Sequence, residues 1–441
     1  MIAWRLAEYI SKIRYADLPD SVVTMAKNCI IDWMGSVLTG AVYPQAQKVG
    51  KLFEPCGGGT ASCLGTAVKV PPVFAALFNG VAAHTVEMDD LHRKTMLHPG
   101  AAVISAAWSA AEASGASGKE LITAVVLGYD IAIRTAEAVA PSHFEYWYPT
   151  GTCGAFGAAA AAARVLGLEA SQIVHALGNA GTEAAGLWEF HHEQAMSKQL
   201  LAAKGAMNGL IAALLAGEGF TGPSTIFEGP QGFLKAYSQQ PRPAMLEAGL
   251  GENFKIMETS FKLYPSGRHT HGGIDLALRL RDRGIRPQDV ELIRIKTYRM
   301  GRELVSNPDP RSPVEARFSL PFCVAAALVN GHPTLESFSD ELLDDDQLRR
   351  VMAHTTVEVD PELDLLYPNY WPTVIELIDK SSHIIRERAD YPKGDPENPA
   401  SSAEIHAKFI KLASEVLGRE KSAQTLATLL QLEQVDKTNL I

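Results

Sequence analysis

The chain has 441 residues, of which 46% are hydrophobic and 20% charged, and its formal net charge is −10. This length exceeds what one hydrophobic core normally holds, so the sequence predicts two domains. The acidic balance, with a pI near 5.7, disfavours a nucleic-acid surface, which needs a basic stripe. If the substrate is an anion, Lys, Arg and His side chains must gather at one site against the overall charge.

Cysteine usage and the N-terminus indicate the compartment. Five cysteines are scattered without a CxxC pair or a metal-like quartet, which is typical of reduced thiols in cytoplasm. The N-terminus, MIAWRLAEYISKIRY, is amphipathic and lacks the apolar stretch of a signal peptide. Charges and glycines interrupt the alanine-rich runs before they reach membrane-spanning length. We therefore expect a soluble, cytoplasmic protein without a membrane partner.

Helical periodicity dominates from Ala3 to about Arg242. Two segments, GAFGAAAAAARVLGL and AAKGAMNGLIAALLAGEG, carry small residues on all faces, which indicates helices that touch neighbours on several sides. The predicted helices after the first one are 22–38, 73–86, 101–114, 118–139, 154–166 and 198–215.

The pattern changes near Phe254. Near-alternating residues predict strands at 291–298, 354–360 and 374–378, with helices at 273–283 and 320–330 between them. After the Pro/Gly-rich stretch 391–396 the chain is helical again. The expected fold is mainly α with an inserted α+β domain: a helical domain of residues 1–253 and 395–441, and an α+β lid domain of residues 254–394.

The first polar cluster runs from Asn79 to His92 and on to His98. Three carboxylates and three histidines lie within the fifteen residues 84–98. A metal site is one interpretation, because Asp and His both ligate metals, but HExxH and facial-triad spacings are absent, and capping or ion pairing explains most of these residues. His98 differs because it precedes Pro99 at a predicted helix start, where anions bind.

Three further clusters follow. Tyr146–Gly154 combines aromatic residues with Thr and Gly before a helix, which suits either carboxylate binding or a cover for the core. Lys198 precedes a long apolar helix, where partial desolvation makes a lysine a plausible proton shuttle. In Lys262–Gly273, an Arg that grips carboxylates and two histidines crowd a Gly/Pro loop at the expected domain junction.

In this order and spacing, the clusters resemble the MmgE/PrpD family, which includes 2-methylcitrate dehydratases, cis-aconitate decarboxylases and an iminodisuccinate epimerase. The matching stretches are FNGVAAHTVEMDD with HPG, GAFGAAAAAARVLGL, MSKQ, GLIAALLAGEGFTGP, FKLYPSGRHTH and YPKGDPENP. The resemblance implies a helical domain completed by the C-terminal segment, an inserted lid domain, a homodimer, and an active site in the interdomain cleft without metal or organic cofactor.

Carried over by position, the family's cleft residues fall on Asp89 or Asp90, His98, Lys198 and His271. The chain also departs from the family pattern, and these departures weaken an exact transfer of decarboxylase or dehydratase activity. The departing positions are Tyr148-Pro149 in place of His-Pro, Leu201 in place of His, Ser266-Gly267-Arg268 in place of CCH, and Phe322 in place of Tyr.

The residues thus predict cofactor-independent proton transfer next to a carboxylate of a small di- or tricarboxylate. Such chemistry needs a placed base and cations that stabilise an enediolate-like intermediate. The predicted catalytic residues are Lys198, His98 and Tyr148. The predicted substrate-binding residues are Arg268, His271, His269, Asp90 and Asp89.

The enediolate-like intermediate can lead to three reactions: epimerisation, dehydration and decarboxylation. Tyr148 in place of a histidine offers a weak, usually protonated group to the second face of the substrate, and this favours an epimerase acting on an aminopolycarboxylate such as iminodisuccinate. The alternative is a lyase of the 2-methylcitrate dehydratase or cis-aconitate decarboxylase type. An inactive binding or scaffold protein is the alternative from another class, and His98 and Lys198 argue against it.

Overall fold

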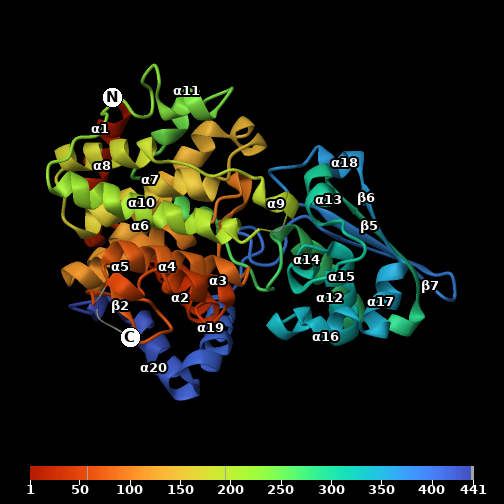
Figure 1. Ribbon diagram of the computed structural model, residues 1–441. Coiled ribbons are helices and arrows are strands. Elements are labelled where there is room, and N and C mark those ends of the chain that lie inside the picture. Colours follow the sequence, from red (N-terminus) through yellow and green to blue (C-terminus); the bar gives the residue numbers. More distant parts are fainter. Residues whose placement is uncertain (57, 194, 439–441) are drawn as a thin grey trace. The chain divides into compact units, whose positions relative to one another are not determined.

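A computed structural model describes residues 1–56, 58–193 and 195–438, and the chain divides into two compact units. Unit 1 comprises Met1–Thr259 together with the residues from Ser401 onward, and unit 2 comprises Ser260–Ala400. Unit 1 is helical and unit 2 combines helices with a sheet (Figure 1). The prediction of a mainly α protein with a smaller α+β region is therefore confirmed.

The helices of unit 1 begin at sequence signals. Ser117 and Glu120 form a capping box at the start of α6, and proline occupies the first position of α5 and α7. The helices of this unit are α1 Ile2–Lys12, α2 Asp20–Gly40, α3 Pro44–Gly50, α4 Pro72–Thr85, α5 Pro99–Ser114, α6 Gly118–Val139, α7 Pro149–Val165, α8 Ala170–Thr182, α9 Phe190–Glu193, α10 Ser197–Gly217, α11 Phe233–Tyr237, α19 Ser402–Leu417 and α20 Arg419–Leu430.

The centre of unit 1 is built from helices with small side chains. Helix α7 packs against α5, α6 and α10, and a Cβ atom on Gly157 would lie 2.5 Å from the carbonyl oxygen of Gly128 on α6. Helix α10 is the one described helix long and apolar enough to span a membrane, and 56% of that window is buried. Because α10 also packs against α4, α5, α7 and α8, we interpret it as a core helix.

The C-terminal helices belong to unit 1. Helix α19 packs against α2 and α20 (Figure 1, blue beside red-orange). A capping box of Ser401 and Glu404 starts α19 directly after the chain leaves unit 2. Residues from both ends of the sequence therefore build one helical core.

Unit 2 is a four-stranded sheet with helices. Strand order is β6-β5-β7-β8, with β5 and β6 parallel and the other pairs antiparallel. Its apolar core includes Leu320, Phe322 and Val324 of α15 and Ile293 and Ile295 of β5. The main elements are α12 His271–Asp282, β5 Val290–Thr297, α13 Arg299–Val305, α14 Pro313–Arg317, α15 Leu320–Asn330, α16 Asp340–Leu343, α17 Asp346–Ala353, β6 Thr355–Val359, α18 Pro361–Asp364, β7 Thr373–Asp379 and β8 Ile384–Ala389.

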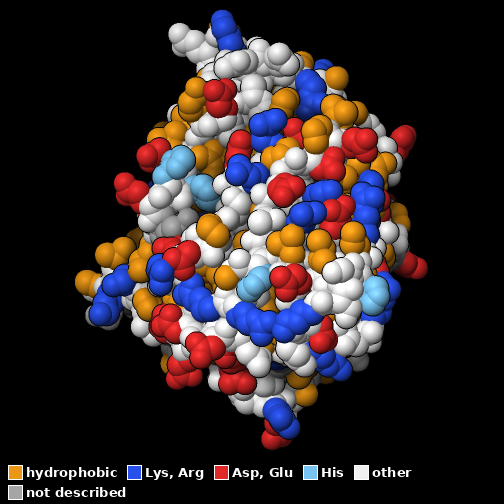
Figure 2. Space-filling view, turned by 90° about the vertical axis from the view of Figure 1, so that its right-hand side faces the viewer, with side chains coloured by type: hydrophobic (Ala, Val, Ile, Leu, Met, Phe, Trp, Pro, Cys, Tyr) orange, Lys and Arg blue, Asp and Glu red, His pale blue; other side chains and the backbone are white. Residues whose placement is uncertain are grey.

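The surface carries both signs of charge. On the face drawn in Figure 2, basic and acidic side chains lie next to one another, between apolar ones. This face has no broad basic area of the kind that binds a nucleic-acid backbone, which agrees with the net charge of −10.

Candidate active site

Four helix ends of unit 1 carry polar side chains from the clusters seen in the sequence. His84 lies in the last turn of α4, His98 is the N-cap of α5, Tyr148 is the N-cap of α7, and Lys198 is the second residue of α10. Helices α5 and α10 pack against each other and against both α4 and α7. Three of the ends are N-termini, where backbone N–H groups and the helix dipole favour an anion.

Asp89 joins both histidines at this site. Its Oδ2 lies 2.6 Å from Nδ1 of His84 and 3.1 Å from Nδ1 of His98. The other ring nitrogen of His84, Nε2, lies 2.8 Å from the hydroxyl of Tyr148. The carboxylate fixes the His84 proton on Nδ1, so Nε2 accepts the hydrogen bond that Tyr148 donates.

Tyr148 is held as a protonated phenol. Its side chain is 1% exposed, and its ring contacts Trp188 and Phe190 with centroid distances of 4.8 and 5.3 Å. Burial raises the pKa of Tyr148 well above its ordinary value, and the charges of Asp89 and Glu87 raise it further. At neutral pH this group is therefore a proton donor, and it acts as a base only after His84 takes its proton.

Lys198 forms an ion pair with Glu87. The lysine side chain is 14% exposed and the glutamate 5%, so the pair is largely removed from water. Glu87 has a φ of 55°, a left-handed conformation that is uncommon for a residue other than glycine. The charge of Lys198 also lowers the pKa of His191, after the larger effect of burial.

We expect Lys198→Met to lower kcat about 10²–10⁴-fold, the usual loss when a placed acid/base group is removed. Measurement of kcat and KM on the reacting substrate checks this. Lys204→Met, on the same helix and partly exposed, is the matched control and should retain activity. A kcat within twofold of the parent would exclude Lys198 from proton transfer.

Asp90 differs from its neighbour. It accepts hydrogen bonds from the backbone N–H of Gly100 at 3.1 Å and from the hydroxyl of Tyr129 at 2.7 Å. Burial raises the pKa of Asp90 to about 8, with the charge of Asp32 adding to the effect. A Cβ atom on Gly100 would lie 2.6 Å from Oδ1 of Asp90. Asp90 therefore holds the loop against the start of α5, whereas Asp89 contacts the two histidines.

Two predicted substrate ligands lie buried within unit 2. The guanidinium of Arg268, 3% exposed, donates to Oδ1 of Asp395 at 2.6 Å, to three backbone carbonyls and to Nδ1 of His271 at 2.9 Å. A guanidinium can only donate, so His271 accepts on Nδ1. This arrangement favours a structural role for both residues, and their binding of substrate stays a prediction.

His269 is the partly exposed histidine of the same loop. Its ring stacks on Trp371 at 4.2 Å with an interplanar angle of 7°, and its Nδ1 lies 2.5 Å from the hydroxyl of Tyr298. Stacking and this hydrogen bond fix the orientation of the ring. Binding of substrate by His269, like that by the other two basic residues of this loop, stays a prediction.

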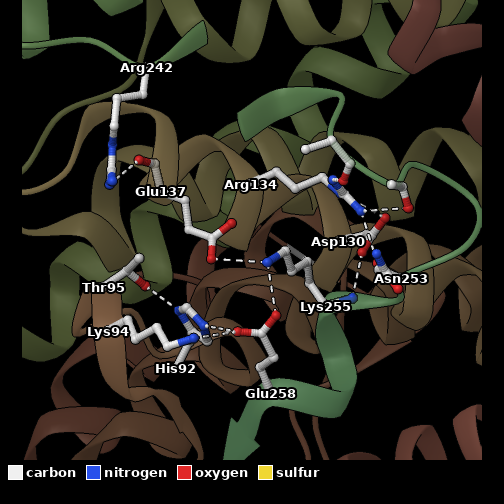
Figure 3. Close-up of polar contacts among 12 residues, drawn as sticks. His92, Lys94, Thr95, Asp130, Arg134, Glu137, Arg242, Asn253, Lys255 and Glu258 are labelled. Carbon is white, nitrogen blue, oxygen red and sulfur yellow. Dashed lines mark hydrogen bonds and ion pairs between the residues drawn. The ribbon is translucent and has the colours of Figure 1, made fainter. Parts of the chain in front are cut away.

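Two groups of described residues have metal-ligand types within 4.8 Å of one another: His84, Asp89 and His98, and His92, Glu137 and Glu258. In the first, Nδ1 of His84 is a hydrogen-bond donor to Asp89 and would have to lose its proton to ligate. In the second, the ammonium of Lys255 lies 3.0 Å from Glu137 and 2.8 Å from Glu258 (Figure 3). A protein cation thus already occupies the position between those carboxylates.

The sequence prediction did not include His84 and Glu87 among the site residues, although both lie in the first polar cluster. A histidine five residues before an aspartate was a weak signal, because its other partner, Tyr148, is 64 residues away in sequence. Glu87 pairs with a lysine 111 residues away. These pairings depend on the packing of α4, α7 and α10 and have no local sequence signature.

Two family models match this chain. The model of the MmgE/PrpD N-terminal domain matches residues 4–246, and that of the MmgE/PrpD C-terminal domain matches residues 264–434. The chain belongs to the MmgE/PrpD family. The family resemblance seen in the sequence motifs is therefore confirmed.

Curated relatives of this MmgE/PrpD chain are named as a decarboxylase, a decarboxylase-like protein and a dehydratase. A cis-aconitate decarboxylase-like protein, oryM, of Aspergillus oryzae is 28% identical over 97% of this chain and 94% of the relative. The human cis-aconitate decarboxylase is 26% identical over 99% and 92%. A 2-methylcitrate dehydratase of Cupriavidus necator is 24% identical over 81% and 77%. These relatives support an enzyme and the lyase alternative, and they lend no specific support to epimerisation.

Proposed function

We propose that this chain is a lyase that removes CO2 from a small unsaturated polycarboxylate such as cis-aconitate, without a cofactor. The observation that carries the proposal is the hydrogen-bonded series Tyr148, His84 and Asp89, with His98 on the same carboxylate oxygen. Relatives named as cis-aconitate decarboxylases that align over nearly the whole chain support the choice of substrate.

The reaction needs a proton donor more than a strong base. When the bond to the departing carboxylate breaks, its electron pair moves through the adjacent double bond to a carbon next to another carboxylate. That carbon then takes a proton, so one C–C bond is lost, one C–H bond forms and CO2 leaves. A phenol whose pKa is raised by burial is still far more acidic than the C–H bond that forms when such a carbanion is protonated, so it can protonate the carbanion.

Binding of the remaining carboxylates falls to positive groups of the site. The N-termini of α5, α7 and α10 supply part of this charge. Lys198, which is also predicted to take part in proton transfer, adds its ammonium. Because His98 and Lys198 keep exposed side-chain area, 10% and 14%, we place the substrate against these two groups and the hydroxyl of Tyr148, with His84 behind that hydroxyl.

Epimerisation of an aminopolycarboxylate such as iminodisuccinate is the second candidate. The observation in its favour is the presence of two proton-transfer groups of different kind, His98 and Tyr148, with ring centroids 6.5 Å apart. Two such groups on opposite faces of a substrate would invert a carbon. Dehydration is less well served, because a phenol with a raised pKa is a weak acid for a departing hydroxide.

NMR in D2O with cis-aconitate, 2-methylcitrate and iminodisuccinate separates the three reactions. We expect loss of CO2 from the unsaturated tricarboxylate, with one deuterium in the product. Inversion of iminodisuccinate without loss of carbon would establish the epimerase, and loss of water would establish the dehydratase. If none of a wider panel of di- and tricarboxylates reacts, the proposal of an enzyme acting on this class is wrong.

We also expect the activity to survive exhaustive dialysis against EDTA and to need no added nucleotide. The reason is that both ring nitrogens of His84 are engaged in hydrogen bonds, Nδ1 with Asp89 and Nε2 with Tyr148. Activity that disappears on dialysis and returns only with a divalent metal would contradict this expectation.

A further inference from the structure

The loop between α4 and β3 (Leu91–His92), here called the site loop, consists of residues 86–90. Its side chains point to different partners in turn: Glu87 pairs with Lys198, Asp89 with both histidines, and Asp90 with Tyr129. Met88 stands in the middle, and its backbone carbonyl accepts a hydrogen bond from Lys408. This lysine lies 320 residues further along the chain, on α19.

Lys408 is not a surface residue. It is 8% exposed, and its ammonium also lies 2.6 Å from Oδ1 of Asp32 on α2. Taking an ammonium out of water is costly and is sustained only by close hydrogen bonds and an opposite charge. Here one of those bonds goes to the backbone between two site residues, which a lysine serving only to join α19 to α2 would not require.

The surroundings of Lys408 are rich in acidic groups. Asp32, Glu87, Asp89 and Asp90 are all buried, and the charges of Asp32 and Asp89 are among the causes that raise the pKa of Asp90. The charge of Asp32 also raises the pKa of the Cys29 thiol, after the larger effects of burial and of Asp90. A buried cation at this place offsets the repulsion among carboxylates that the site loop would otherwise suffer.

We propose that Lys408 is a positioning residue of the active site, which holds the carbonyl of Met88 so that Glu87 and Asp89 face Lys198 and the two histidines. The proposal rests on the proposed function for the identity of the site, and it adds a contribution from the C-terminal segment. Since displacing reacting groups by about 1 Å can cost about 10²-fold in rate, the expected effect is on kcat.

Three variants test this. Lys408→Met removes the ammonium, and Asp32→Leu with Lys408→Met replaces the buried ion pair by apolar groups, a change that is often neutral or stabilising. Lys411→Met, exposed on the same helix, is the control. We expect kcat to fall about 10²-fold in both the single and the double variant, with KM little changed, while the double variant regains thermal stability.

Recovery of kcat together with stability in the double variant would show that Lys408 is merely structural and would overturn the proposal. A second readout needs no substrate: NMR of protein labelled with ¹⁵N-histidine, with His84 and His98 assigned by substitution. Lys408→Met should shift both resonances and leave that of the exposed His383 unchanged. Unshifted His84 and His98 signals overturn the proposal whichever reaction the chain catalyses, whereas failure of the proposed function alone leaves this readout intact.

Discussion

Tyr148→Phe is expected to lower kcat about 10²–10⁴-fold, with a smaller change in KM. The change removes one oxygen atom and keeps the ring that packs on Trp188 and Phe190, so the fold should persist. What is lost is the only proton that this side chain can give and the hydrogen bond to Nε2 of His84. Steady-state rates on the substrate found in the D2O panel provide the measurement.

Tyr146→Phe is the matched control, since Tyr146 lies two residues away and is 58% exposed. His84→Asn supplies a second test, because His84 can act only through Tyr148 and Asp89. If Tyr148 and His84 work as one unit, kcat of the double variant Tyr148→Phe with His84→Asn should be little lower than kcat of either single variant. Multiplicative losses would instead assign independent roles to Tyr148 and His84.

The Tyr148→Phe variant also distinguishes a lyase from an epimerase. In a decarboxylase, Tyr148→Phe should slow formation of the deuterated product. In an epimerase, it should abolish inversion yet leave exchange of solvent deuterium on the face served by His98. Full inversion by Tyr148→Phe would rule out Tyr148 as the group on the second face.

Helix positions in unit 1 were largely predictable because they follow from local signals. The predicted helix 101–114 corresponds to α5, Pro99–Ser114, and the predicted helix 118–139 to α6. The start of α7 was predicted at 154, five residues late, although Pro149 marks it at the first helical position. Because α7 begins at Pro149, Thr150 and Thr152 belong to its first turn, and the aromatic loop ends at Tyr148.

The strands show why a prediction from sequence patterns misses some elements. Strands β5, β6 and β7 lie close to the predicted ranges, but β8, Ile384–Ala389, was not predicted. It is an edge strand that pairs only with β7, and its residues alternate between exposed and half-buried, with Ala389 the only buried one. With one face in solvent and an exposed isoleucine at its start, it lacks the apolar alternation that marks a half-buried strand.

The sequence could indicate some candidate residues at helix ends, but it could not indicate their partners. His98 and Lys198 stand at helix starts that Pro99 and the small-residue run of α10 indicate, whereas the helix start after Tyr148 was predicted five residues late. The choice between Asp89 and Asp90 depends on which way two adjacent side chains turn. Only the folded loop sends Asp89 to the histidines and Asp90 to Tyr129.

Arg268→Met is expected to lower the free energy of unfolding by about 3–5 kcal/mol, the usual cost of removing one partner of a buried ion pair. The sequence alone predicts a different main effect, a raised KM from weaker carboxylate binding. The structure favours the first outcome, because Arg268 bonds to Asp395 and to the carbonyls of Phe261, Pro392 and Lys393. These contacts tie together three segments of unit 2.

Calorimetry of the variant, combined with kcat and KM, decides between the two outcomes. Arg283→Met is the control, since the Arg283 side chain is 58% exposed in its pair with Glu387, and exposed pairs are worth only about 0–1 kcal/mol. Arg268→Met with Asp395→Leu removes both buried charges and should regain part of the stability. An unchanged unfolding temperature with a tenfold higher KM would instead place Arg268 on the substrate, because a guanidinium committed to five internal hydrogen bonds cannot be lost without cost.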